Sequence, residues 1–342
     1  MKHTMHFKPD IEQSVERCRA LWAFRELDPP FMMVSAPEAL VASGAHDCRF
    51  WEDPEGFAAH HEQVFERRLG IRDDTVPVLR PPLSHATVPG ALGAKVELHG
   101  EHLWSVPTLK DLRDHRDLSL RGGGAWTALV ERYYRRLLEL ASGRFFVGLC
   151  EVPGPADLMG ALRGYQEILT DLVDAPELVV EFALQAAGLA QEFDRLVRGW
   201  TAGQESFGGG WVASAWAPAN TLQFCEHSSV NYSPAQYERF LEPANRVLME
   251  AYHRVVSYVY CGTGRHLVTR YFERPRPVWV RCCDGEAPEA LMRAHRGRAI
   301  VTVRTSPPKL SDAIARFGTC GVCYLVECAS LQQAEEVGRR FW

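Results

Sequence analysis

At residues 278–283, 299–304 and 322–328 the sequence reads VWVRCC, AIVTVR and VCYLVEC, and this part of the chain decides the fold class. Helix signals separate the three apolar runs: Pro288 and Ser306-Pro307 stand where helices would begin, since proline fits a first helical turn without losing a hydrogen bond. Continuous apolarity, rather than strict alternation, is typical of strands covered on both faces of a parallel sheet. This region therefore predicts repeated strand–helix units.

The same alternation extends outward over the rest of the chain. The apolar runs that we interpret as strands are eight in number: Phe31–Ser35, Val76–Arg80, Phe145–Cys150, Trp211–Trp216, Val255–Cys261, Val278–Cys283, Ala299–Arg304 and Val322–Cys328. Eight strands with intervening helices predict an α/β fold, a single (β/α)8 TIM barrel over residues 1–342. An N-terminal helical extension (1–30) and a hairpin excursion (93–106) would be additions to it. The alternative, a doubly wound sheet, lacks a GxGxxG or GxxxxGK[ST] fingerprint.

Composition excludes several classes of protein. Hydrophobic residues make up 46% of the 342 residues and the net charge is −5, so the chain can bury a large core and lacks the basic excess of a nucleic-acid-binding protein. No run approaches the roughly 20 apolar residues of a membrane span, and residues 1–10 lack the apolar core of a signal peptide. We therefore expect a cytoplasmic protein, without membrane or nucleic-acid partners, whose ten cysteines are thiols.

Reactive groups in a barrel lie at the carboxyl ends of its strands. Thiols close several predicted strands, and Glu226 and His227 stand near another; cysteine and histidine from different strands could hold zinc. Core packing is the alternative for each thiol, because free cysteine is often only buried filler. We expect one cavity at the mouth of the barrel to be lined by Trp216, Glu226, Ser229, Cys261, His266 and Cys328.

A family resemblance rests on two long segments. Residues 154–164 (GPADLMGALRG) and 233–243 (SPAQYERFLEP) resemble the uroporphyrinogen decarboxylase superfamily, and shorter matches lie at 50–54, 103–107 and 264–267. The resemblance runs over nearly the whole chain in the superfamily's order and spacing. It implies a TIM barrel, in agreement with the strand count.

The superfamily contains two branches with different chemistry. Its porphyrinogen decarboxylases grip carboxylates with arginines after the first strand, but residues 31–38 contain none, so we do not expect uroporphyrinogen to be a substrate. Its corrinoid-dependent methyltransferases bind zinc through a His-x-Cys-Gly and a later cysteine, which Cys261-Gly262 and Cys328 match. Val259 occupies the histidine position, so the third ligand would be His227, Cys282 or Cys283.

The resemblance thus implies an enzyme that transfers a methyl group between a small substrate or thiol and a corrinoid carried by a partner protein. We expect Glu226 and His227 as catalytic residues, Trp216, Ser229 and His266 as substrate-binding residues, and zinc held by Cys261, Cys328 and His227.

Two other functions stay open at this point. One is a lyase, a decarboxylase of a non-porphyrin substrate, for which the candidate carboxylate-binding residues are Arg163, Arg265, Arg270 and Arg281. The other is a binding barrel without catalysis. The sequence also leaves open whether the chain forms a homodimer.

Overall fold

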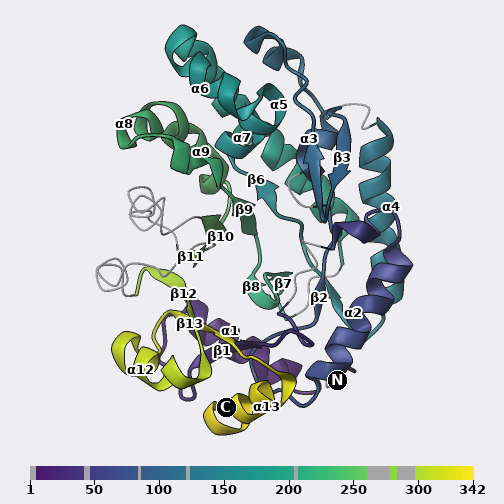
Figure 1. Cartoon of the computed structure of the whole chain (residues 1–342), viewed down its shortest axis with the longest axis vertical. Helices are drawn as coiled ribbons and strands as arrows, with labels where there is room; N and C mark the ends of the chain where they lie inside the picture. The colour runs from purple at the N-terminus through teal and green to yellow at the C-terminus, as the bar shows by residue number, and fades with distance from the viewer. Residues whose placement is uncertain are drawn as a thin grey trace.

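The structure is a computed structural model that describes residues 5–41, 47–83, 86–120, 124–203, 207–259, 277–282 and 297–342. It is a mixed α/β fold with a central parallel sheet of seven strands. In Figure 1 these strands follow one another in a curve, and most of the helices lie outside it. Within the described ranges, no helix has both the length and the apolarity that crossing a membrane requires.

The elements are best given by kind. The strands are β1 (Phe31–Ser35), β2 (Val78–Leu79), β3 (Val96–His99), β4 (His102–Ser105), β5 (Phe146–Val147), β6 (Val152–Pro153), β7 (Gly209–Val212), β8 (Ala215–Pro218), β9 (Thr221–Cys225), β10 (Arg254–Val259), β11 (Val278–Cys282), β12 (Ala299–Thr305) and β13 (Val322–Glu327). The α-helices are α1 (Ile11–Trp22), α2 (Pro54–Arg68), α3 (Thr87–Ala91), α4 (Gly124–Ala141), α5 (Pro155–Arg163), α6 (Tyr165–Asp174), α7 (Pro176–Trp200), α8 (Pro234–Gln236), α9 (Glu242–Glu250), α12 (Pro307–Phe317) and α13 (Leu331–Phe341). Short 3-10 turns lie at Cys48–Phe50, Leu112–Asp117 and Ser228–Asn231, and a π-helix at Tyr237–Leu241.

The order of strands in the sheet is β1-β13-β12-β11-β10-β9-β6, and all six pairings are parallel. All eight predicted runs overlap a strand, and five of them overlap strands of this large sheet. The antiparallel pair of β3 and β4, with Gly100 at φ 62°, confirms the predicted hairpin excursion. Helix α1 lies within the predicted N-terminal extension.

The run at 145–150 leads to a strand in two pieces. Its first piece, β5, pairs with β2, whereas its second piece, β6, pairs with β9. Gly148 lies between the two, and its N–H still donates to the Leu79 carbonyl at 2.7 Å. An added Cβ at Gly148 would lie 2.7 Å from the Val78 side chain and 3.0 Å from the Trp211 carbonyl oxygen, so this position requires glycine. The split strand links the two-stranded β2–β5 sheet to the large sheet.

Carboxylates join β1 to the segment before β2, where no strand ladder forms between the described residues. The Asp74 carboxylate accepts from the Met32 N–H at 2.8 Å, and the Asp74 backbone N–H donates to the Met32 carbonyl at 2.7 Å. The Asp73 carboxylate accepts from the Val34 N–H at 2.8 Å. We call this junction the β1 seam. Its acids are matched by cations: Arg17 bonds Asp74 at 2.7 Å and Arg68 bonds Asp73 at 2.6 Å.

One strand prediction is wrong. The run at 211–216 is not a strand of the sheet but the middle of an antiparallel hairpin, β7–β8. Ala213 and Ser214 form its two-residue turn, both with positive φ, 51° and 61°, as the turn type that suits tight hairpins requires. The sheet strand is β9, which begins five residues further on and whose five side chains are all buried.

An apolar cluster at the amino ends of the strands combines α1, the β7–β8 hairpin and inward side chains of the sheet. Trp22 of α1 lies edge-on to Trp279 of β11, with ring centroids 6.0 Å apart, and Trp279 lies edge-on to Phe31 of β1 at 6.2 Å. In Figure 1 the hairpin lies inside the curve of strands. The interior is therefore packed from its amino-terminal side.

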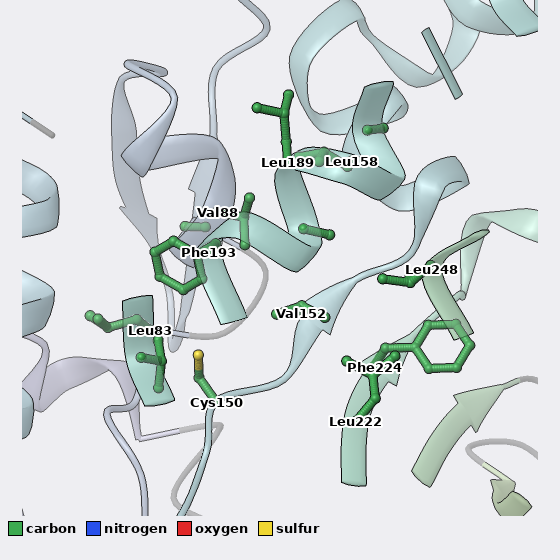
Figure 2. Close-up of a cluster of buried hydrophobic side chains, with 14 of the residues drawn as sticks. Leu83, Val88, Cys150, Val152, Leu158, Leu189, Phe193, Leu222, Phe224 and Leu248 are labelled. Carbon is green, nitrogen blue, oxygen red and sulfur yellow. The ribbon is translucent and has the colours of Figure 1, made fainter. Parts of the chain in front are cut away.

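The outer face of the sheet packs on helices. Val152 of β6 and Leu222 and Phe224 of β9 share one buried cluster with Leu158 of α5 and Phe193 of α7, as Figure 2 shows. Since side chains alternate across a strand, Gln223 and Cys225 must point to the opposite, inner face. This alternation places Cys225 at the inner carboxyl end of β9.

Candidate functional site

The candidate site lies at the carboxyl ends of β6 and β9, where helix α5 begins. Pro155 starts α5 directly after β6, with proline in the first turn. The loop after β9 carries Glu226, His227 and Ser229 and contains a short 3-10 turn. The Gly154 N–H donates to the Cys225 carbonyl at 2.6 Å, which holds the two strand ends together.

Two carboxylates join helix α5 to the loop after β9 through hydrogen bonds. Asp157, in the first turn of α5, accepts from the backbone N–H groups of His227 at 3.0 Å and Ser228 at 2.6 Å. In return, Glu226 accepts from the Ala156 N–H at the start of α5, at 2.9 Å. A carboxylate is favoured there because a helix N-terminus exposes unbonded N–H groups and a partial positive charge. We call this arrangement the α5 clasp.

Glycine is required beside the clasp. An added Cβ at Gly154 would lie 2.8 Å from the carboxyl carbon of Glu226, whose side chain is fully buried. Ser229, also buried, donates from its hydroxyl to the Glu226 carbonyl at 2.8 Å. The position of Glu226 is therefore fixed by packing as well as by hydrogen bonds.

Three possible metal donors converge at the clasp. One ligand atom each of Asp157, Cys225 and His227 lies within 4.8 Å of the other two; Asp157 and Cys225 are buried and His227 is half-buried. Thiolate, imidazole and carboxylate are the ligand types of zinc sites. We call these three residues the donor triad.

The surroundings of Cys225 are acidic. Burial, foremost, and the carboxylates of Glu151 and Asp157 raise the pKa of the Cys225 thiol well above its usual value. Glu151 is itself paired with the buried Arg80, which follows β2, at 3.1 Å. The thiol is thus protonated at neutral pH as long as no cation lies next to it.

Part of the predicted site comes together in the structure. Glu226, His227 and Ser229 lie side by side in the loop after β9. Trp216 lies elsewhere: it belongs to β8 and packs in the amino-terminal cluster, with the Arg19 guanidinium 5.2 Å from its ring. The structure does not bring Trp216 to the clasp.

Cys328 also lies apart from the clasp. It packs in an apolar cluster with residues of β1, α12 and α13, and burial raises the pKa of its thiol to about 11. Cys150 packs in the cluster outside the sheet, and the pKa of its thiol is raised to about 12, mainly by burial. Both thiols serve as core packing here.

Several predicted residues cannot be placed. Cys261, His266 and Cys283, together with Arg265 and Arg270, lie outside the described residues. Of the other candidate arginines, Arg163 bonds Asp171 at 2.8 Å and Arg281 donates to the Ala213 carbonyl at 2.9 Å.

Two members of the donor triad are not evident from the sequence. Asp157 stands within the GPADLMGALRG segment, but nothing in that segment alone shows that its carboxylate faces the loop after β9. Cys225 ends the run TLQFC, which forms β9, whereas the strand prediction in this part of the chain fell on residues 211–216. The signal that could have found it is this apolar run directly before Glu226-His227.

A cavity of about 300 Å³ lies at the opposite end of β9, between the end of α7 and the β7–β8 hairpin. Thr221, the first residue of β9, and Trp211 line it. It is separated from the donor triad by the length of the strand and is not part of the candidate site.

Comparison with known proteins informs the fold. No protein-family model and no curated protein matches the sequence. Among solved structures, the chain is similar to a methyltransferase from Methanosarcina mazei, with 13% sequence identity and a TM-score of 0.61. The similarity covers 95% of this chain and 96% of that one, so the two share an overall architecture.

Proposed function

We propose that the chain is a methyltransferase of the uroporphyrinogen decarboxylase-like class, which transfers a methyl group between a small substrate or thiol and a corrinoid carried by a partner protein. In this proposal β1, β2, β5 with β6, and β9 to β13 form a closed (β/α)8 barrel. The observation that carries the proposal is the convergence of a thiol, an imidazole and carboxylates at the carboxyl ends of β6 and β9. The similarity to a methyltransferase along 95% of the chain supports it.

The residues of the site suit transfer to a thiol. In the metal-free site, the methyl acceptor's sulfur forms a bond to the methyl carbon and gives up its proton, which the half-buried imidazole of His227 can accept. The bond between the methyl carbon and its donor breaks, and its electron pair stays with the donor. The donors present fit zinc; an ion bound there would occupy His227 and would itself favour the thiolate form of the acceptor at neutral pH, with the proton leaving to solvent. Glu226 keeps the loop that carries His227 on the start of α5.

The test uses the full chain with methylcobalamin as methyl donor and a panel of small thiols. We expect loss of methylcobalamin absorbance and a methyl thioether detected by mass spectrometry. His227→Gln should lower the rate at least about 100-fold, the usual contribution of a general base, whereas His253→Gln, at an exposed histidine, should not. Failure of every thiol to react faster than without protein would contradict the proposal.

The decarboxylase alternative has less support. A carboxylate-gripping site needs free arginines, and the described candidates, Arg163 and Arg281, are engaged with Asp171 and with the Ala213 carbonyl. We continue to expect that uroporphyrinogen is not turned over. Its decarboxylation at an enzymatic rate would overturn this expectation.

A further inference from the structure

We infer that Asp157, Cys225 and His227 form a binding site for one zinc ion, at the junction of β6, β9 and α5. This site shares His227 with the zinc site expected from the sequence, but its other two ligands differ. That site would use Cys261, which is outside the described residues, and Cys328, which packs against α12 and α13.

The geometry of the donors favours a metal over a chance grouping. The three ligand atoms lie within 4.8 Å of one another, although they come from a helix start, a strand end and a loop. Ligands bound to one tetrahedral ion at 2.0–2.3 Å are mutually separated by roughly 3.3–3.8 Å, so small side-chain rotations would complete the site.

Charge favours a cation at the same point. Asp157 is buried, and within the described part of the chain it accepts from two backbone N–H groups and lies in no ion pair. Glu151 also lies beside Cys225. A buried carboxylate without a counter-ion is costly, and a divalent ion would supply the missing positive charge. On binding, the Cys225 sulfur exchanges its proton for the metal, and the proton leaves to solvent.

The donor types select the metal. A mixed thiolate, imidazole and carboxylate set suits zinc rather than magnesium or calcium, which prefer oxygen ligands only. Three protein ligands leave a fourth position for water or substrate, as in catalytic zinc sites. Only this use of the fourth position rests on the proposed methyl transfer; the binding of the ion does not.

The α5 clasp would orient two of the ligands before metal arrives. Asp157 accepts from the backbone of His227, so a hydrogen bond connects these two ligand residues directly. Since the N–H groups of His227 and Ser228 occupy one position on each carboxylate oxygen, lone pairs remain for an ion. Such supporting hydrogen bonds are typical of metal sites, where their loss lowers affinity about 10–100-fold.

The experiment measures metal binding by the full chain after chelator treatment. Co²⁺ serves as the spectroscopic probe, since a cobalt–thiolate bond gives a charge-transfer absorption, and Zn²⁺ is then used in competition. We expect one equivalent of cobalt with a single thiolate. Cys225→Ser should abolish the charge-transfer band, and His227→Gln should weaken binding at least about 100-fold, beyond the effect of losing a supporting hydrogen bond.

Matched controls use thiols outside the triad. Cys323→Ser removes another fully buried inward thiol and Cys328→Ser the thiol near α12, and neither should change the band. Because His227 is half-buried, His227→Gln keeps the test valid if Cys225→Ser does not fold.

Three results would overturn the inference: no cobalt binding by the parent chain, an unchanged band in a folded Cys225→Ser variant, or an unchanged affinity in His227→Gln. Loss of the band in Cys261→Ser or Cys328→Ser, with Cys225→Ser intact, would move the metal to other residues. Methyl transfer by a chain that binds no cobalt would remove the site but leave the proposed function, whereas metal binding without methyl transfer would do the reverse.

Discussion

The β1 seam and the α5 clasp are both built on buried carboxylates, but they differ in how the charge is balanced. In the seam, Arg17 and Arg68 bond Asp74 and Asp73 directly. In the clasp, Asp157 and Glu226 accept from backbone N–H groups. A carboxylate with a full cationic partner holds two segments together, whereas Asp157, which pairs with no cation among the described residues, can still attract an added one. We therefore propose a structural use of the carboxylates in the seam and a metal-binding use of Asp157 in the clasp.

The largest effect should come from breaking the seam. Arg17→Ala leaves the fully buried Asp74 without its guanidinium, so we expect a loss of about 3–5 kcal/mol in the free energy of unfolding. Urea unfolding measures it. The control is Arg246→Ala, which breaks an exposed pair with Glu242 and should cost under about 1 kcal/mol. If Arg17→Ala lowered the free energy of unfolding by less than about 1 kcal/mol, the ion pair of the seam would be no stronger than an exposed one.

A smaller loss of stability, with a larger change in binding, should follow from Gly154→Ala. The new Cβ would meet the Glu226 carboxyl at 2.8 Å and displace the clasp, at a cost of about 1–3 kcal/mol. Cobalt affinity should fall with it. Gly188→Ala in α7 is the matched control, because its Cβ would meet no atom within 4 Å and alanine favours a helix. Unchanged cobalt affinity in Gly154→Ala would show that the clasp does not contribute to metal binding.

Ser229→Ala should cost about 1 kcal/mol, since it removes one buried hydrogen bond to the Glu226 carbonyl. Cobalt stoichiometry should stay the same, because Ser229 is not in the donor triad. Thr170→Ala provides a reference for an exposed hydroxyl bonded to a helix carbonyl and should change stability very little. Loss of cobalt binding in a folded Ser229→Ala variant would give this serine a role that the structure does not predict.

Cys328 should show a change in reactivity without a change in stability. Burial raises its pKa to about 11, above the ordinary thiol value, so the thiol form dominates at neutral pH. Since only the thiolate reacts, alkylation by iodoacetamide at pH 8 should be about 100-fold slower than for an exposed cysteine peptide, and should rise about tenfold per pH unit from 8 to 10. Peptide mapping gives the rate for each cysteine.

Zinc provides the control for that measurement. It should protect Cys225 from alkylation and leave Cys328 unaffected. Alkylation of Cys328 at the rate of the exposed peptide, or its protection by zinc, would contradict the packing role.

Most of the fold could be predicted from local sequence, because a buried parallel strand needs only a short apolar run between helix signals. The β7–β8 hairpin could not, since Ala213 and Ser214 take positive φ without the glycine or asparagine that announces such a turn. Their apolar neighbours Trp211 and Trp216 therefore resembled a single strand. Because the strand was predicted at 211–216, β9 and its last residue, Cys225, were not predicted.

The candidate site was predictable only where its residues are consecutive. Glu226, His227 and Ser229 stand together in the sequence, so one loop brings them into the site. Asp157 lies 70 positions from His227, and only the pairing of β6 with β9 makes them neighbours. The metal ligands implied by the resemblance remain a prediction for Cys261, while Cys328 shows that a strand-end thiol can face the outer helices.

The plug formed by α1 and the β7–β8 hairpin has a consequence for evolution. Tryptophans of α1, of the hairpin and of the sheet pack against one another there, so a substitution of one of them must be compensated by changes in its neighbours. These tryptophans must therefore change by several coordinated substitutions, so related chains should diverge slowly around Trp279.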